Sequence, residues 1–285
     1  KTLLQKIISA TCLFSVLGLF VSTQVLAQAG AFPRTPSGKP DFSGIWQAMT
    51  SAHYNVEPHA ASEGPYPGLF GALSATPGGL GIVEGSRIPY NEQGRRQADA
   101  NRASAIENDP MAKCYMPGVP RANYMPFPFQ IVQSQNVVLI AYEVAEANRI
   151  LYVDQPDLES QVDAWMGHSN AHWEGDTLVV ETANFGEQRK WIPLATGRPG
   201  LVSTANMTLV ERFTRVDEDT LDYTFTVTDP DTWASPWTMT MPMRRTDMPL
   251  FEYACHEGNY GMVGMLAGAR AEEKAAGPAA NQRSR

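Results

Sequence analysis

Two histidines and two tryptophans lie close together in residues 163–185, with His168 and His172 between Trp165 and Trp173. Imidazole titrates near neutral pH, so it serves as a general acid or base and as a metal ligand. Tryptophan adds a flat apolar surface with one hydrogen-bond donor. The tight Gly175-Asp176 step that follows favours a hairpin. We predict that this hairpin forms one wall of a ligand pocket and that both tryptophans contact the ligand.

His172 is the histidine that we expect to matter most, because it precedes the hairpin turn, where a barrel strand reaches the rim of its cavity. Strand parity places His168, His172 and Glu174 on one face and the two tryptophans on the other. Both sets line one cavity only if the strand is distorted, so we predict a bulge near residues 169–171.

A metal site is the alternative use of these histidines. Residues four apart on a strand point the same way but lie about 13 Å from each other, too far to bind one ion directly. A bend at Ser169-Asn170 would bring them closer, with Asp163 and Glu174 as carboxylate ligands. No regular ligand spacing is present, so we predict neither a metal nor another cofactor.

A second cluster of reactive side chains is Cys255-His256-Glu257. An imidazole with a nearby carboxylate is suited to acid–base catalysis, which makes His256 and Glu257 candidate catalytic residues together with His168 and His172. The alternative is structural: one of the two caps the helix that follows and ties it to the barrel.

Aromatic and sulfur side chains mark two further strands. Tyr223 lies in the alternating run Leu221 to Thr228, and Trp237 opens a strand that continues with Met239, Met241 and Met243. Methionines at period 2 suggest copper in an exported protein, but they are more often core residues. We predict that Tyr223 and Trp237 contact the ligand.

These residues need a β-rich scaffold. Short alternating strands separated by turns follow one another from Phe129 to Met243, without helical crossovers. This pattern predicts an all-β fold: a single antiparallel β-barrel or barrel-like sandwich, similar to lipocalins and calycins. One helix at residues 91–108 precedes the meander and one at 261–276 closes the chain. A last short strand is predicted at 251–256, and the tail beyond 277 is expected to fray.

Trp46 and the long loop after it complete the scaffold. Ser43-Gly44-Ile45-Trp46 resembles the start of lipocalin-like barrels, in which a tryptophan plugs the closed end. Residues 51–85 lose periodicity and fill with Pro, Gly and Ser, as in a functional loop. They form either a lid over the pocket or an insertion along the surface. We predict that seven side chains are buried: Trp46, Val138, Ile140, Val180, Tyr223, Phe225 and Met241.

The first 29 residues resemble an export signal: Lys1 and Lys6 precede an apolar run that ends at Ala27-Gln28-Ala29. An uncleaved membrane anchor is the alternative. We predict a signal peptide at 1–29, one domain at 30–285, no membrane contact after cleavage, and a periplasmic or secreted protein. Without the signal, 20 basic and 30 acidic residues remain, a formal charge of −10, which disfavours nucleic acid as a partner.

Export leaves two cysteines, Cys114 and Cys255, in an oxidising compartment where disulfides persist. The alternative is a pair of free buried thiols. We predict a disulfide between them.

Several motifs of the chain are similar to those of a family of exported bacterial proteins of uncharacterised activity. They are Cys114…Pro117-Gly118…Pro120-Arg121, Trp173-Glu174-Gly175-Asp176 with the following Thr177 to Thr182, Glu211-Arg212-Phe213, and Tyr253-Ala254-Cys255-His256-Glu257-Gly258-Asn259-Tyr260-Gly261. The resemblance covers nearly all of the chain after the signal and implies export and a β-rich fold.

Two functions are consistent with these observations. The first is a lipocalin-like protein that binds a small, largely apolar ligand, which the aromatic strand faces and the long loop favour. The second is a cofactor-independent isomerase, lyase or hydrolase that uses the histidines and Glu257. An enzyme requires at least two of these four groups to converge on one pocket.

Overall fold

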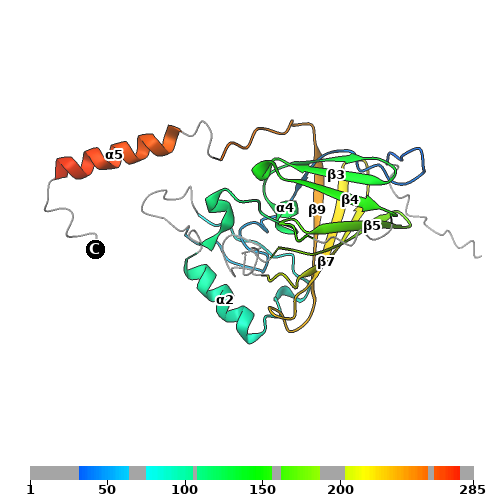
Figure 1. Ribbon diagram of the computed structural model, residues 1–285, viewed down its shortest axis with the longest axis horizontal. Coiled ribbons are helices and arrows are strands. Elements are labelled where there is room, and N and C mark those ends of the chain that lie inside the picture. Colours follow the sequence, from blue (N-terminus) through cyan, green and yellow to red (C-terminus); the bar gives the residue numbers. More distant parts are fainter. Residues whose placement is uncertain are drawn as a thin grey trace, which may run out of the picture.

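The computed structural model describes residues 32–63, 75–104, 108–155, 162–186, 203–255 and 260–276. Within these residues nine strands close into a barrel (Figure 1). The strands are β1 Gly44–Ala48, β2 Phe129–Gln133, β3 Val137–Tyr142, β4 Asn148–Val153, β5 His168–Glu174, β6 Thr177–Ala183, β7 Thr208–Arg215, β8 Thr220–Thr228 and β9 Trp237–Thr246. The predicted all-β barrel is therefore confirmed.

Most of the helical residues lie in the chain between β1 and β2 and at the C-terminal end. The helices are η2 Glu84–Ser86, α2 Glu92–Ala103, η3 Pro110–Lys113, α4 Arg121–Tyr124, η4 Val144–Glu146 and α5 Tyr260–Ala276. The helix expected before the meander is α2, which the side chain of Asn91 caps by accepting a hydrogen bond from the Gly94 amide. The expected C-terminal helix is α5, which extends away from the barrel in Figure 1.

Each strand pairs with its neighbour in sequence, and β9 pairs with β1 to close the barrel. Strand directions cannot alternate all the way around a ring of nine, so at least one pair must be parallel. That pair is β4 and β5, in which Leu151 lies opposite Ser169. The sequence predicted antiparallel pairing throughout, and closure with an odd number of strands is the reason for the difference.

Side chains alternate between the two faces of each strand, and those on the inward face fill the barrel. In β8 the inward residues Leu221, Tyr223, Phe225 and Val227 are buried, and Thr224 and Thr226 on the outer face bond to threonines of β9. The methionines of β9 are inward core residues, as predicted. All seven side chains that the sequence predicted to be buried are no more than 2% exposed: Trp46, Val138, Ile140, Val180, Tyr223, Phe225 and Met241.

One end of the barrel, which we call the hairpin end, carries the turns at 134–136, 175–176 and 216–219. Trp46 closes it: the indole is fully buried, and its Nε1 donates to the Phe42 carbonyl at 2.8 Å. The guanidinium of Arg215 lies 5.4 Å from the centre of the indole. Phe42 in turn stacks on Trp173 at 5.6 Å. Aromatic packing thus seals this end.

The opposite end, which we call the insertion end, is covered by the chain between β1 and β2. All four residues of α4 are buried there, and Tyr124 stacks on Phe225 of β8 at 6.2 Å. Arg121 forms a bidentate ion pair with Asp109, with both hydrogen bonds at 2.7 Å. This pair fixes the Pro-Arg segment that the sequence motifs singled out.

One local prediction in this part of the chain is wrong. No strand forms at 251–255, where the chain leaves the barrel instead, and His256 lies outside the described residues. In β3 the inward residues are buried and the outer residues are partly exposed. The described residues of the loop predicted at 51–85 are attached to the barrel at Val83, which forms a backbone bridge with Met239.

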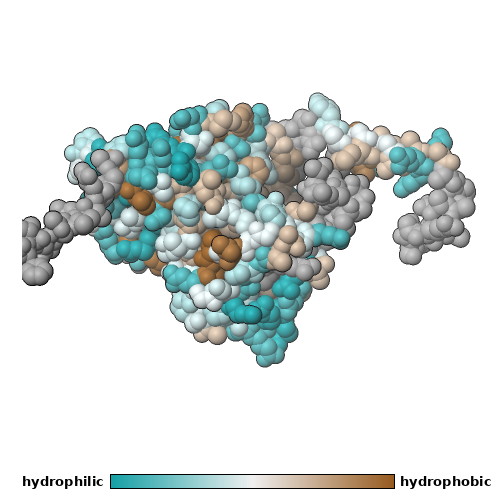
Figure 2. All heavy atoms as spheres, turned by 180° about the vertical axis from the view of Figure 1, so that it is seen from behind, coloured by the Kyte–Doolittle hydropathy of each residue, from teal (hydrophilic) through white to brown (hydrophobic). Residues whose placement is uncertain are grey.

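Cys114 and Cys255 form the predicted disulfide, with 5.8 Å between their Cα atoms. The bridge joins the segment before α4 to the chain after β9. Among the described residues, no helix has the length and apolar character needed to cross a membrane. The face shown in Figure 2 is mainly hydrophilic, with apolar residues in separate patches. The predicted signal at 1–29 and the tail beyond 277 lie outside the described residues.

Candidate functional site

A group of polar side chains lies inside the barrel toward the insertion end. We call it the lumen cluster: Asn123, Tyr142, Arg149, Ser169, Thr182, Glu211 and Tyr223. Arg149 forms a bidentate ion pair with Glu211 and also donates to Ser169 Oγ at 3.0 Å and Thr182 Oγ1 at 2.6 Å. Every member is at most 3% exposed.

Hydrogen bonds within the lumen cluster satisfy its polar atoms. Oε1 of Glu211 accepts from Asn123 at 2.8 Å, from Tyr223 at 2.6 Å and from Arg149 at 3.0 Å. Tyr142 donates to the amide oxygen of Asn123 at 2.7 Å. Burial raises the pKa of Tyr142 and of Tyr223 well above the usual value of a phenol. The cluster thus connects α4 to six strands, β3 to β8, which is the role of a polar network that specifies a fold.

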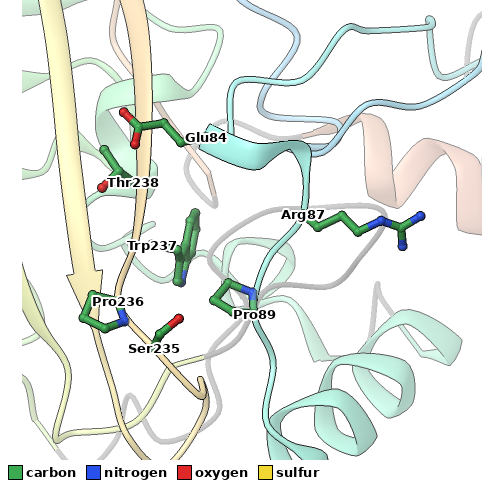
Figure 3. A pocket seen from close by; sticks show the side chains of 7 residues that line it. All are labelled: Glu84, Arg87, Pro89, Ser235, Pro236, Trp237 and Thr238. Carbon is green, nitrogen blue, oxygen red and sulfur yellow. The ribbon is translucent and has the colours of Figure 1, made fainter.

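A pocket of about 290 Å³ opens beside the insertion end (Figure 3). We call it the mouth pocket. Glu84, Arg87 and Pro89 form one side, and the residues from Ser235 to Thr238 form the other. The rings of Pro89, Pro236 and Trp237 are its apolar surfaces. Its volume is just below the range of about 300–1,000 Å³ that is typical of small-molecule sites.

Backbone hydrogen bonds on both sides hold the mouth pocket open. On one side, Val83 forms a bridge with Met239, and the Thr240 amide donates to the Ile82 carbonyl at 3.3 Å. On the other, the Ala234 amide donates to the Pro89 carbonyl at 2.8 Å. The segment between these two attachments bows away from β9, and the pocket is the space that it leaves. Because both walls are fixed, the pocket exists before any ligand arrives.

Helix α2 supports the attachment between Pro89 and Ala234. The Asn91 amide donates to the Thr232 carbonyl at 3.0 Å, and its side-chain amide donates to Pro230 O at 3.1 Å. Gly94 lies so close to this loop that a Cβ atom there would be 2.1 Å from the Thr232 carbonyl oxygen. Only glycine permits this approach. Asp229 fixes the loop itself by accepting hydrogen bonds from Thr204 and Thr232.

Trp237 connects the mouth pocket to the barrel. Its ring packs edge-to-face against Trp233 at 5.4 Å and against Phe225 at 6.2 Å, and the residue is only 5% exposed. In Figure 3 the nitrogen-bearing edge of the indole is turned toward Ser235 and Pro236. The sequence predicted both the inward orientation of Trp237 and a role in ligand binding, and the structure places it at a pocket.

His168 and His172 lie on the outer wall of the barrel. Ser169 and Ala171 occupy the inward positions of β5, and all seven residues of β5 pair with β6 in unbroken register. The predicted bulge is therefore wrong, because small residues already fill the inward face without one. Nε2 of His168 is 2.7 Å from the Val162 carbonyl oxygen.

His172 belongs to a group of charged side chains on that outer wall. Its Nε2 is 3.4 Å from Glu174, which also accepts a hydrogen bond from Arg212 at 2.7 Å. The hydrogen bond from Arg212 is the largest cause that lowers the pKa of Glu174 below its usual value. Among the described residues, no three His, Cys, Asp or Glu side chains are placed to hold a metal ion.

The remaining predicted site residues are not brought together. Trp165 lies near the insertion end, where it stacks on Tyr115 at 5.2 Å and donates to the Met116 carbonyl. Trp173 lies at the hairpin end beside Phe42. Tyr223 belongs to the lumen cluster, and His256 and Glu257 lie outside the described residues.

Sequence reasoning missed Arg149, Glu211 and Asn123 as members of one interior group. One signal was present: Glu211 lies between the apolar residues Leu209 and Phe213 on the inward face of β7. A charged residue at an inward position requires a buried partner. No comparable signal marked Pro89, because its place in the pocket depends on backbone contacts far apart in sequence.

The chain matches no protein-family model, and no curated protein matches it.

Proposed function

We propose that this protein is an exported, lipocalin-like binding protein that takes a small, largely apolar ligand in the mouth pocket. The observation that carries the proposal is the preformed pocket between Pro89, Pro236 and Trp237 at one end of a closed barrel. The three rings suit the apolar body of a ligand, the four polar lining residues suit a few polar atoms on it, and the limited volume suits a small molecule.

The position of the ligand differs from that in an open-lumen barrel. The inward side chains of the nine strands are buried against one another, and α4 and the lumen cluster occupy the insertion end. The interior therefore acts as a rigid support, and the pocket lies where the chain between β1 and β2 meets β9. Export is supported by the signal-like first 29 residues and by the disulfide.

The catalytic alternative has less support. His168 and His172 point outward from β5, which separates them from the mouth pocket. The polar side chains of the lumen cluster form hydrogen bonds to one another, and all of its residues are buried. No observation on the described residues brings two of the four acid–base candidates to one cavity.

Native mass spectrometry of the protein purified from its own host tests the proposal. We expect a retained small molecule that denaturation releases. Ser235 is exposed at the pocket, so Ser235→Phe fills the pocket without disturbing the core and should abolish retention. Ser37→Phe is the matched control, because Ser37 is an exposed serine in the segment before β1. Equal retention by wild-type protein and Ser235→Phe would show that the ligand lies elsewhere.

A further inference from the structure

Helix α5, Tyr260–Ala276, exposes apolar side chains along its first half. Residues 260–269 include no charged side chain, and four of their large apolar side chains are 48–83% exposed: Tyr260, Val263, Met265 and Leu266. A helix that is apolar on all sides is normally buried against a partner. This half of α5 is therefore a surface that the described part of the chain leaves uncovered.

The helix also needs support from outside itself. Gly261, Gly264 and Gly268 lie within it, and each glycine costs about 1 kcal/mol of helix stability relative to alanine. Most helical stability in proteins comes from the packing of an apolar face rather than from the helix alone. In Figure 1 α5 extends away from the barrel, so the barrel of the same chain does not supply this packing.

The outer face of β2, β3 and β4 is a second uncovered apolar surface, which we call the apolar wall. Val132, Leu139 and Ile150 lie in one line across the three strands, and Val132 and Ile150 are 49% and 47% exposed. None of the outward residues is charged: Gln130, Val132, Val137, Leu139, Ala141, Asn148, Ile150 and Tyr152.

The other strands that follow in the barrel differ in this respect. Each strand from β5 to β9 has at least one charged residue on its outer face: Glu174, Glu181, Arg212, Asp222 and Arg244. The apolar wall is thus distinct from the outer faces of β5–β9.

One side of α5 matches the apolar wall. Residues at i, i+3, i+7 and i+11 share one side of a helix, and here they are Val263, Leu266, Arg270 and Lys274. This side is apolar in its first half and basic in its second. The ten uncharged residues of α5 span about 15 Å, and the six-residue strands of the wall span about 20 Å.

Acidic residues stand at the two ends of the apolar wall. Glu146 precedes β4 and Asp154 follows it, and both are exposed. When the apolar half of α5 lies along the wall, its basic half is at one end of the wall, close to a carboxylate. The helix and the wall therefore agree in length, in apolar character and in charge.

The charge of the whole chain favours the same partner. Residues 30–259 include 16 basic and 28 acidic residues, a formal charge of −12, whereas residues 260–285 include four basic and two acidic residues, a formal charge of +2. The barrel attracts such a segment, and it is repelled by an anionic membrane surface. A second barrel is thus a better partner for α5 than a membrane.

We propose that two copies of this chain form a symmetric dimer in which α5 of each copy packs against the apolar wall of the other. This exchange covers the helix and the wall of both copies. It uses the same contact twice, as two-fold symmetry requires.

Light scattering coupled to size-exclusion chromatography of the full oxidised protein tests the proposal, and we expect the mass of a dimer. Val132→Asp on the apolar wall and Val263→Asp on α5 each place a carboxylate in the contact. Each should weaken dimerisation by about a hundredfold or more. Both valines are exposed in the single chain, so neither change disturbs the core.

Val210→Asp is the matched control, because Val210 is an exposed valine on the outer face of β7. It should remain dimeric. An equimolar mixture of Val132→Asp and Val263→Asp then identifies the exchange. The first copy keeps an intact helix and the second keeps an intact wall, so the mixture should form more dimer than either variant alone.

Four outcomes would overturn the proposal. The first is wild-type protein that is monomeric up to its solubility limit. The second is a dimer that Val263→Asp dissociates and Val132→Asp does not, which would be a helix–helix pair. The third is equal dissociation by Val210→Asp, and the fourth is a mixture that forms no more dimer than its components.

Discussion

The guanidinium of Arg149 and the carboxylate of Glu211 form a bidentate ion pair inside the barrel, between β4 and β7. Asn123 of α4 joins them by donating to Glu211 at 2.8 Å. Through this contact the short helix that covers the insertion end is attached to the strands beneath it. The pair therefore supports the end of the barrel at which the mouth pocket lies.

Glu211→Gln should strongly destabilise the protein, because it leaves the charge of Arg149 buried without a counter-charge. Loss of one partner of a buried pair costs about 3–5 kcal/mol. Urea unfolding measures the change. The double variant Arg149→Met/Glu211→Gln removes both charges and should be less destabilised than Glu211→Gln alone. If Glu211→Gln lowers the free energy of unfolding by less than about 1 kcal/mol, water reaches the pair.

Alkaline pH should destabilise the fold through its buried tyrosines. Burial raises the pKa of Tyr90, Tyr142 and Tyr223 above the value of about 10 in the unfolded chain. The folded state thus holds these protons more tightly. The stability that they contribute is fully present below pH about 10 and is lost as the pH rises above it.

Urea unfolding at a series of pH values checks this loss, with a slope of up to about 1.4 kcal/mol per pH unit for each tyrosine. Tyr90→Phe is the control, because no described residue bonds to its hydroxyl. It should reduce the slope with little effect at neutral pH. Tyrosinate absorbance that develops fully before unfolding begins would contradict the account.

Gly94→Ala should loosen the mouth pocket. The new methyl group would lie 2.1 Å from Thr232 O, so α2 or the loop must move, at a cost of about 1–3 kcal/mol. The affinity for a small apolar probe such as 2-ethylnaphthalene should fall along with the melting temperature. Gly264→Ala is a matched change within α5, where nothing lies within 4 Å, and should be neutral or slightly stabilising. Equal effects of the two variants would refute the close contact.

Removal of the disulfide should lower stability substantially. Cys114 and Cys255 are 141 residues apart, and closing so long a loop is worth about 5 kcal/mol in the chain-entropy model. Urea unfolding of Cys114→Ser/Cys255→Ser, compared with the oxidised protein, measures the loss. A change of less than about 1 kcal/mol would mean that the segments joined by the bridge are ordered without it.

The barrel and much of its core could be predicted because the signals are local. Alternation in β8 identifies its inward face, and the turn at Gly175-Asp176 identifies the hairpin of β5 and β6. The parallel pairing of β4 and β5 has no local signal. It follows from closure of nine strands, which becomes apparent only when all the strands are counted.

The orientation of β5 shows why the predicted site was only partly located. Its inward residues Ser169 and Ala171 are small and give only a weak apolar signal, so the conspicuous histidines were taken as part of the pocket wall. Ser169 is small and polar because it accepts a hydrogen bond from Arg149 inside the barrel. This requirement becomes visible only when β4 and β5 are placed side by side. Trp237 was identified because it opens a strand with clear alternation.

The indole nitrogens report most directly on the central claim, that a ligand binds at Trp237. The chain has six tryptophans, and 15N labelling of their side chains gives one indole resonance for each, with Trp237 assigned from the spectrum of Trp237→Phe. Titration with 2-ethylnaphthalene, a small apolar probe, should shift the Trp237 resonance most and that of Trp233 next, while Trp46 and Trp173 at the hairpin end stay unchanged. Saturable shifts confined to Trp46, Trp165 or Trp173, with Trp237 unmoved, would contradict the account.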